Sequence, residues 1–175
     1  MTVAYQGAPG AFGHAACLAF LPEHEARPLS RFEDVVGAVA SGEAEFGMLP
    51  VENSRAGEVP GVRALIAGAG LRTVRTHVLP LRMHLLGLPG ADRRAIAAVA
   101  SHPVALRQCA RSLDRLGLRR EEAPNTAVAA RGLRDPRKAV LASETAASLY
   151  GLEILERDMQ DDPDNATLFA LVARA

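Results

Sequence analysis

Short apolar runs alternate with stretches of helical spacing along most of the chain. Residues 3–6 form an apolar run that predicts a buried strand, and a helix over about 12–21 follows a turn rich in Gly and Pro. The alternation returns further on, with strands predicted at 45–51, 97–100 and 138–142. Strands that alternate with helices are typical of an α/β domain.

Capping residues set the expected helix boundaries in the first half. Ser30–Glu33 has the capping-box pattern and predicts a helix that continues to about Ser41 and ends at Gly42. Pro60 suits the first turn of a further helix, which should end near 68–70.

The second half follows the same logic. Ser101 or His102 is expected to cap a helix that has Pro103 in its first turn and apolar positions as far as Leu116. Asn125 opens the next helix. A last helix is predicted at 143–150, and extended segments at 71–76, 78–87, 153–158 and 167–173.

Composition and charge narrow the class of protein. The 175 residues carry 20 basic and 20 acidic side chains, so the absence of net charge argues against a general nucleic-acid surface. Every apolar run is interrupted too soon to span a bilayer, so no membrane partner is expected. The chain enters a strand pattern without a secretion signal, and its two cysteines form no close pair, which together predict a cytoplasmic protein.

Four short motifs carry the chemistry of the sequence. They are Val51–Gly57 (Val-Glu-Asn-Ser-Arg-Ala-Gly), Ser101–Cys109, Asn125–Ala127 and Asn165–Phe169. Together they resemble the landmarks of the prephenate dehydratase family, over about residues 3–172. One position departs from the family pattern, because Leu168 stands where the family has Arg in Thr-Arg-Phe.

The resemblance implies a fold and a domain organisation. The family is α/β, with a two-lobed type II periplasmic-binding-protein-like fold and the active site in the inter-lobe cleft. The first lobe is then expected at about 1–76 plus 160–175, and the second at about 77–159. No regulatory ACT domain, which usually follows in this family, is found in the sequence, so a homodimer is expected to use the catalytic lobes.

The resemblance also implies a reaction without cofactor or metal. Prephenate loses carbon dioxide and its ring hydroxyl, and the ring becomes aromatic phenylpyruvate. Thr167 matches the family threonine and is expected to donate a hydrogen bond that strengthens as charge develops on the leaving oxygen. Leu168 cannot pair with a carboxylate, which keeps prephenate decarboxylase open as an alternative. Two further alternatives are an arogenate dehydratase and a non-catalytic module that binds a small anion.

Three polar residues follow the strand predicted at 45–51. Asn53 and Ser54 can bond a carboxylate or hydroxyl, and Glu52 could orient a donor or relay a proton. The same residues are common in turns and caps, but the family pattern favours a catalytic role for all three.

Helix starts are the expected source of donors for the substrate anion. Ser101, His102, Asn125, Thr126 and Ala127 lie where strands turn into helices and backbone N–H groups are exposed. These residues are predicted to bind substrate; Ser101, Asn125 and Thr126 can also be simple helix caps, and a cap or packing role explains His102 as well as direct chemistry does.

Three further residues complete the predicted substrate site. Gly10 and Phe12 belong to a glycine-rich loop that resembles the first loop of the family and lacks the spacing of a dinucleotide fingerprint. Phe169 ends the last motif.

The acidic stretch 161–164 lacks the spacing of a calcium loop and is read as solvated, so no metal site is predicted.

Overall fold

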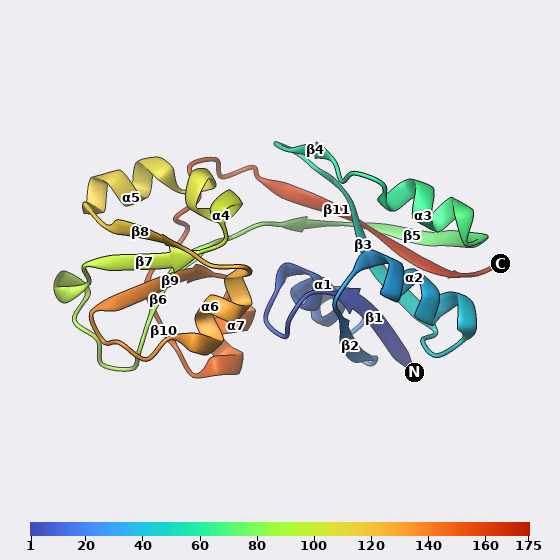
Figure 1. The fold of residues 1–175 in the computed structure, drawn as a ribbon, viewed down its shortest axis with the longest axis horizontal. Helices are drawn as coiled ribbons and strands as arrows, with labels where there is room; N and C mark the ends of the chain where they lie inside the picture. Colours follow the sequence, from blue (N-terminus) through green and yellow to red (C-terminus); the bar gives the residue numbers. More distant parts are fainter. The chain divides into compact units, whose positions relative to one another are not determined.

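The computed structural model describes residues 1–175, which fold into two compact units (Figure 1). The first unit contains Met1–Ala8, Phe12–Leu81 and Asp164–Ala175. The second contains Pro9–Ala11 and Arg82–Pro163. The divisions therefore fall a few residues later than the sequence suggests, and a short piece near the N-terminus belongs to the second unit.

A mixed sheet forms the centre of the first unit. Its strands are ordered β2-β1-β3-β11-β5, and β4 pairs with β3. The strands are β1 (Thr2–Gln6), β2 (Glu25–Leu29), β3 (Phe46–Asn53), β4 (Gly57–Glu58), β5 (Leu71–Pro80) and β11 (Ala166–Arg174). The first three are parallel, whereas β11 runs antiparallel to both β3 and β5. The C-terminal strand thus returns to the first unit, which periodicity alone could not establish.

Helices cover both faces of this sheet. They are α1 (Phe12–Phe20), α2 (Phe32–Ser41) and α3 (Val62–Gly68). Met48 and Phe169 pack in the core that contains α1, while the next residues, Leu49 and Ala170, pack in the core beneath α2 and α3. Because neighbouring strand residues point to opposite faces, each buried strand supplies both cores.

The second unit has its own five-stranded sheet, ordered β10-β6-β9-β7-β8. The strands are β6 (His84–Gly87), β7 (Ala98–Ser101), β8 (Arg119–Glu122), β9 (Lys138–Ala142) and β10 (Glu153–Glu156). The helices are α4 (Pro103–Gln108), α5 (Ala110–Leu116), α6 (Thr126–Gly132) and α7 (Glu144–Tyr150), with a 3-10 turn η1 at Arg93–Ala95. Leu86 and Val140 pack against α6 and α7 in one apolar core.

Two helix starts in the first unit lie later than predicted. Arg31, not Ser30, is the N-cap of α2, and the carboxylate of Asp34 accepts a hydrogen bond from the Arg31 N–H at 3.1 Å. Pro60 precedes α3, whose N-cap is Gly61 in the left-handed region. In both cases a helix forms where the sequence pattern predicts one, but its first turn begins later in the chain than predicted.

The prediction of one continuous helix from Pro103 to Leu116 is wrong. The segment forms two short helices, α4 and α5, which meet at Cys109. The sequence pattern does not predict the strands β2 and β8. They lie at the edges of their sheets, and most of their side chains are exposed, so they lack the apolar pattern of a buried strand. None of the helices combines the length and the apolar character that crossing a membrane requires.

Candidate active site

Asn53 and Thr167 form the centre of the site in the first unit. They lie opposite each other at the paired ends of β3 and β11, and both side chains are more than nine-tenths buried. The Asn53 amide nitrogen Nδ2 donates to the Thr167 hydroxyl oxygen Oγ1 at 3.0 Å. The same nitrogen lies 3.0 Å from the side-chain oxygen of Asn165, which is also buried. Asn165 belongs to the motif Asn165–Phe169, but the motif alone does not indicate this contact with Asn53.

The turn after β3 fixes the orientation of the Asn53 amide. Its oxygen Oδ1 accepts hydrogen bonds from the backbone N–H groups of Arg55 and Ala56, both at 2.9 Å. Gly57 follows with a φ of 78° and allows the chain to reverse into β4. Because the oxygen is held by the turn, Nδ2 must face Thr167. A hydroxyl has one donor and two acceptor positions, so accepting from Asn53 leaves the Thr167 proton to be donated elsewhere.

Ser54 ties the approach of β11 to the end of β3. Its hydroxyl oxygen accepts from the Ala166 N–H at 3.0 Å and lies 3.4 Å from the Asp164 carbonyl oxygen. The Ser54 N–H donates to the Ala166 carbonyl at 2.9 Å. These bonds hold the segment before Thr167 in place, and a direct contact between Ser54 and substrate stays a prediction.

Glu52 and Leu168 lie on the other face of the sheet. They are opposite each other in the strand register, and together with Val78 they line a small cavity of about 200 Å³. The Glu52 carboxylate lies 3.5 Å from the Arg63 guanidinium. Leu168 packs on the core beneath α2 and α3, whereas the residue opposite Thr167 on β5, Leu79, packs on the α1 side. An arginine at position 168 would therefore face Glu52 rather than stand beside Thr167.

In the second unit, Ser101 is a core residue, whereas His102 and Asn125 are helix caps. Ser101 is fully buried, and its hydroxyl donates to the Leu141 carbonyl of β9 at 2.7 Å. His102 is the N-cap of α4, where Nδ1 accepts from the Val104 N–H at 3.2 Å. Of the two residues expected to cap this helix, the structure selects His102.

The start of α6 is built as expected. Asn125 is the N-cap, and its side-chain oxygen accepts from the Ala127 N–H at 2.8 Å. Thr126 is the first helical residue and half-buried, while Ala127 is fully buried. The capping role of Asn125 is confirmed, and substrate contact by these residues stays a prediction.

The two phenylalanines of the predicted site have different surroundings. Phe169 is 2% exposed and packs with Tyr5 and Met48 in the α1-side core, so it stabilises the sheet. Phe12 is the half-buried first residue of α1.

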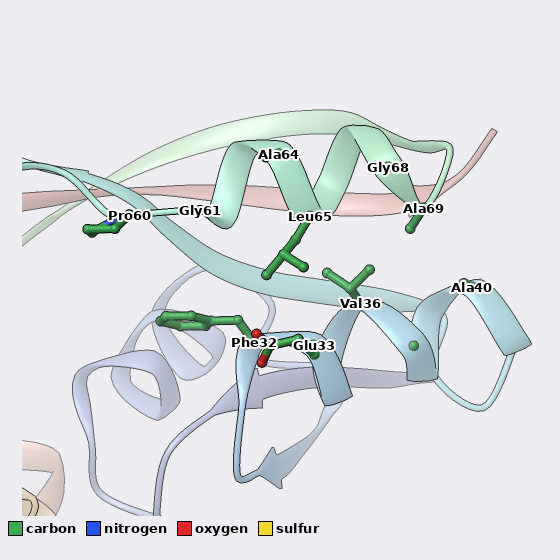
Figure 2. Close-up of a pocket in the computed structure, with 11 residues that line it drawn as sticks. Phe32, Glu33, Val36, Ala40, Pro60, Gly61, Ala64, Leu65, Gly68 and Ala69 are labelled. Carbon is green, nitrogen blue, oxygen red and sulfur yellow. The ribbon is translucent and has the colours of Figure 1, made fainter.

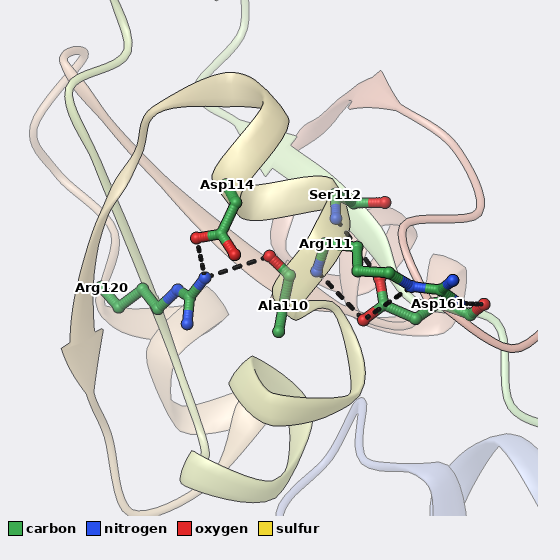
Figure 3. Close-up of polar contacts among 6 residues, drawn as sticks. All are labelled: Ala110, Arg111, Ser112, Asp114, Arg120 and Asp161. Atoms are coloured by element: carbon green, nitrogen blue, oxygen red, sulfur yellow. Dashed lines mark hydrogen bonds and ion pairs between the residues drawn. The ribbon is translucent and has the colours of Figure 1, made fainter.

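The acidic stretch read as solvated has a structural function in the second unit, and Figure 3 shows it. The Asp161 carboxylate accepts hydrogen bonds from the backbone N–H groups of Arg111 at 3.0 Å and Ser112 at 3.3 Å. These are orphan donors of the first turn of α5. Arg120 adds a bond to the Ala110 carbonyl at 3.0 Å. Asp161 is therefore a helix cap, and no group of three or more His, Cys, Asp or Glu side chains is arranged to hold a metal ion.

The two cysteines are buried and free. Desolvation raises the pKa of both thiols to about 12, and the nearby Asp161 carboxylate adds to the shift for Cys109. The thiolate is the reactive form, so neither thiol is poised to act as a nucleophile at neutral pH.

A larger pocket lies apart from the motifs, between α2 and α3 (Figure 2). Its volume is about 630 Å³, and its lining is mostly apolar; Leu65 on α3 and Val36 on α2 project toward each other, and Glu33 lies beside Phe32. Small residues such as Gly37 and Gly68 leave this space open. None of the residues predicted for the active site lines it.

Fold and site together define a class of protein. In the first unit, neutral amide and hydroxyl groups meet at the paired ends of β3 and β11, and such groups suit a small polar ligand. The chain belongs to the prephenate dehydratase family, whose model matches residues 3–175.

Relatives and solved structures agree with this assignment. The chain is 38% identical over 175 residues to arogenate dehydratase/prephenate dehydratase 1 of Arabidopsis thaliana, covering 98% of this chain and 45% of that protein. It is 41% identical over 181 residues to arogenate dehydratase 1 of Petunia hybrida, covering 99% of this chain and 42% of the relative. The chain thus spans less than half the length of these two relatives.

The solved structures confirm the expected two-lobed α/β fold. Prephenate dehydratase of Arthrobacter aurescens, in complex with L-Phe, has a TM-score of 0.90 at 29% identity, covering 100% of this chain and 61% of that one. The quorum-quenching acylase GqqA has a TM-score of 0.92 at 37% identity, covering 100% of this chain and 64% of its own.

Proposed function

We propose that this chain is a lyase domain that converts prephenate to phenylpyruvate by coupled loss of carbon dioxide and the ring hydroxyl. Family membership supports the reaction class. The observation that carries the proposal for this chain is the buried pair in which Asn53 donates to Thr167. Such a pair leaves a threonine proton available to a leaving oxygen.

The chemistry needs little from the protein beyond orientation and one good donor. The bond to the ring carboxylate breaks, and its electron pair enters the ring. The carbon–oxygen bond to the hydroxyl breaks with its electron pair on oxygen, and the departing hydroxide, which the Thr167 hydrogen bond stabilises, takes up a proton from the solvent and becomes water. The Thr167 hydrogen bond strengthens as negative charge develops on the leaving oxygen, which lowers the barrier selectively in the transition state.

Asn53 contributes through Thr167. Its Nδ2 group donates to the threonine oxygen, which polarises the O–H bond and makes it a stronger donor. The same hydrogen bond directs the threonine proton away from the amide. Asn53 is thus a positioning residue for the proposed donor.

Arogenate is the second candidate substrate, since the names of the Arabidopsis and Petunia relatives include arogenate dehydratases. It differs from prephenate in carrying an amine on its side chain, and its product is phenylalanine. Incubation with each substrate, followed by NMR identification of the product, decides between them.

Leu168 is one of two features that favour the decarboxylase alternative, the other being that no ACT domain is found in the sequence. Because Leu168 lies opposite Glu52 and not beside Thr167, its side chain gives no reason for the hydroxyl to be retained. A non-aromatic product that keeps its hydroxyl would nevertheless establish a decarboxylase. Binding of prephenate without turnover would instead establish a small-anion binding module.

The direct test of the mechanism is Thr167→Ala. We expect kcat to fall at least about a hundredfold with KM little changed, since one transition-state donor is lost. Thr76→Ala, at an exposed strand position of the same sheet, is the matched control and should keep its activity. Phenylpyruvate formation is followed by ultraviolet absorbance above the spontaneous rate. Near-normal turnover in Thr167→Ala would remove this residue from the mechanism.

We also propose that the chain works as a homodimer in the cytoplasm. The edge strand β5 supports the homodimer, because this strand is long and exposes the side chains of Val74 and Val78. Uncovered edge strands are templates for pairing with another chain. Light scattering should then give twice the 18.5 kDa of one chain.

Two free thiols support a reducing compartment, which fractionation of the source cells tests.

A further inference from the structure

The loop that joins β1 to α1 contains residues of both units. Residues up to Ala8 and from Phe12 onward belong to the first unit, but Pro9–Ala11 belong to the second. Gly10 in this loop is one of the residues predicted to bind substrate. The contacts that hold these three residues on the second unit therefore bear on the proposed reaction.

Two side chains of the α7 segment bind the loop backbone. The Tyr150 hydroxyl donates to the Pro9 carbonyl at 2.6 Å, and the Ser143 hydroxyl donates to the Gly10 carbonyl at 2.7 Å. Ser143 also caps α7, since its oxygen accepts from the Ala146 N–H at 3.1 Å. Ser143 and Tyr150 are about two helical turns apart, so both hydroxyls lie on the same face.

The loop backbone lies directly on that face of α7. Gly10 has a φ of 88°, and a Cβ at this position would lie 3.1 Å from Ala146 and 3.2 Å from the Tyr150 ring. Both the left-handed backbone and the close approach therefore require glycine here. Consecutive carbonyls of the loop are held by donors on one helix, so the loop has little freedom to rotate its peptide planes.

The two hydrogen bonds also decide where the loop donors point. All peptide bonds are trans, and in a trans peptide the N–H points opposite to the C=O. With the Pro9 and Gly10 carbonyls directed at α7, the N–H groups of Gly10 and Ala11 are directed away from it. The Ala11 N–H is a backbone donor that this loop can direct at an anion.

We propose that Ser143 and Tyr150 are positioning residues that fix the first loop for substrate binding. The inference rests on the proposed lyase function, and it assigns to these residues an effect on the substrate complex rather than on the departure of the hydroxyl. Neither residue lies in the motifs that identify the family here.

Tyr150→Phe is the sharpest test, because it removes one hydroxyl and keeps the ring that packs on Gly10. We expect KM to rise about three- to tenfold with kcat within about twofold, the effect of one lost hydrogen bond. Ser143→Ala should raise KM similarly but also lower the melting temperature, since it removes a helix cap, whereas Ser143→Thr should retain both. Ser148→Ala, at an exposed position of the same helix, is the matched control.

Amide hydrogen exchange across residues 7–13 provides a readout independent of activity. Exchange should become faster in Tyr150→Phe and stay unchanged in Ser148→Ala. Unchanged KM and unchanged exchange in Tyr150→Phe, with an active wild type, would overturn the inference and leave the proposed function standing. A wild-type protein that turns over neither prephenate nor arogenate would overturn the proposed function itself.

Discussion

Replacing Asn53 by aspartate tests the proposed donor arrangement with almost no change in shape. The oxygen that accepts from the Arg55 and Ala56 N–H groups is retained, so the turn after β3 should persist. The donor Nδ2 becomes an oxygen, which can only accept when ionised. The Thr167 hydroxyl, which in the wild type accepts from Asn53 at 3.0 Å, would then donate its proton to the new carboxylate.

The magnitude follows from the reversed hydrogen bond. A threonine proton engaged by the introduced carboxylate is no longer available to the leaving oxygen, so the full effect of one transition-state donor should be lost. We expect kcat to fall about a hundred- to a thousandfold, or about 2.7–4 kcal/mol in barrier height. Burial raises the pKa of a carboxyl, so the introduced group should titrate above the ordinary aspartate value of about 3.9. Once protonated, it can donate to Thr167 again, and part of the activity should return in acid.

The assay is a pH profile of kcat for wild type and Asn53→Asp, with spontaneous aromatisation of prephenate subtracted at each pH. Thermal melts at the same pH values control for folding. A variant that keeps wild-type kcat at neutral pH would refute the role of Asn53. An inactive but folded variant without recovery in acid would refute the argument that hydrogen-bond direction is what matters.

Three further outcomes are expected. Leu168→Arg should keep kcat within about threefold, because the new side chain faces Glu52 across the strands; a tenfold change would show that position 168 acts on the reaction. Gly37→Ala should raise the free energy of unfolding by about 0.5–1 kcal/mol in denaturant melts, since Gly37 lies inside α2 and nothing stands within 4 Å of the added carbon; a loss of stability would contradict this. Burial lowers the pKa of His84, whose Nδ1 accepts from the Asp158 N–H at 3.1 Å, so its contribution to stability is present above about pH 6.5 and is lost as pH falls through the lowered pKa. His84→Gln should reduce the slope of unfolding free energy against pH on the acid side, and an identical slope would exclude His84 as its source.

Much of the local structure follows from the sequence, because its causes act over a few residues. The strand at Lys138–Ala142 and the cap at Asn125 lie where the pattern predicts them. An apolar run specifies a buried strand, and an asparagine two residues before a free N–H specifies a helix start. The motifs around Asn53 and Thr167 identify the family for the same reason, since they can be read directly along the chain.

Only the tertiary structure decides which of these residues act together. Asn53 and Thr167 are separated by 114 residues and meet because β11 returns to pair with β3 in one particular register. That register also places Leu168 on the face away from Thr167. The helix expected to continue past Cys109 restarts instead, where Asp161, 50 residues from Arg111, caps a new helix. Such contacts depend on strand register and packing between distant segments, and local propensity does not specify either.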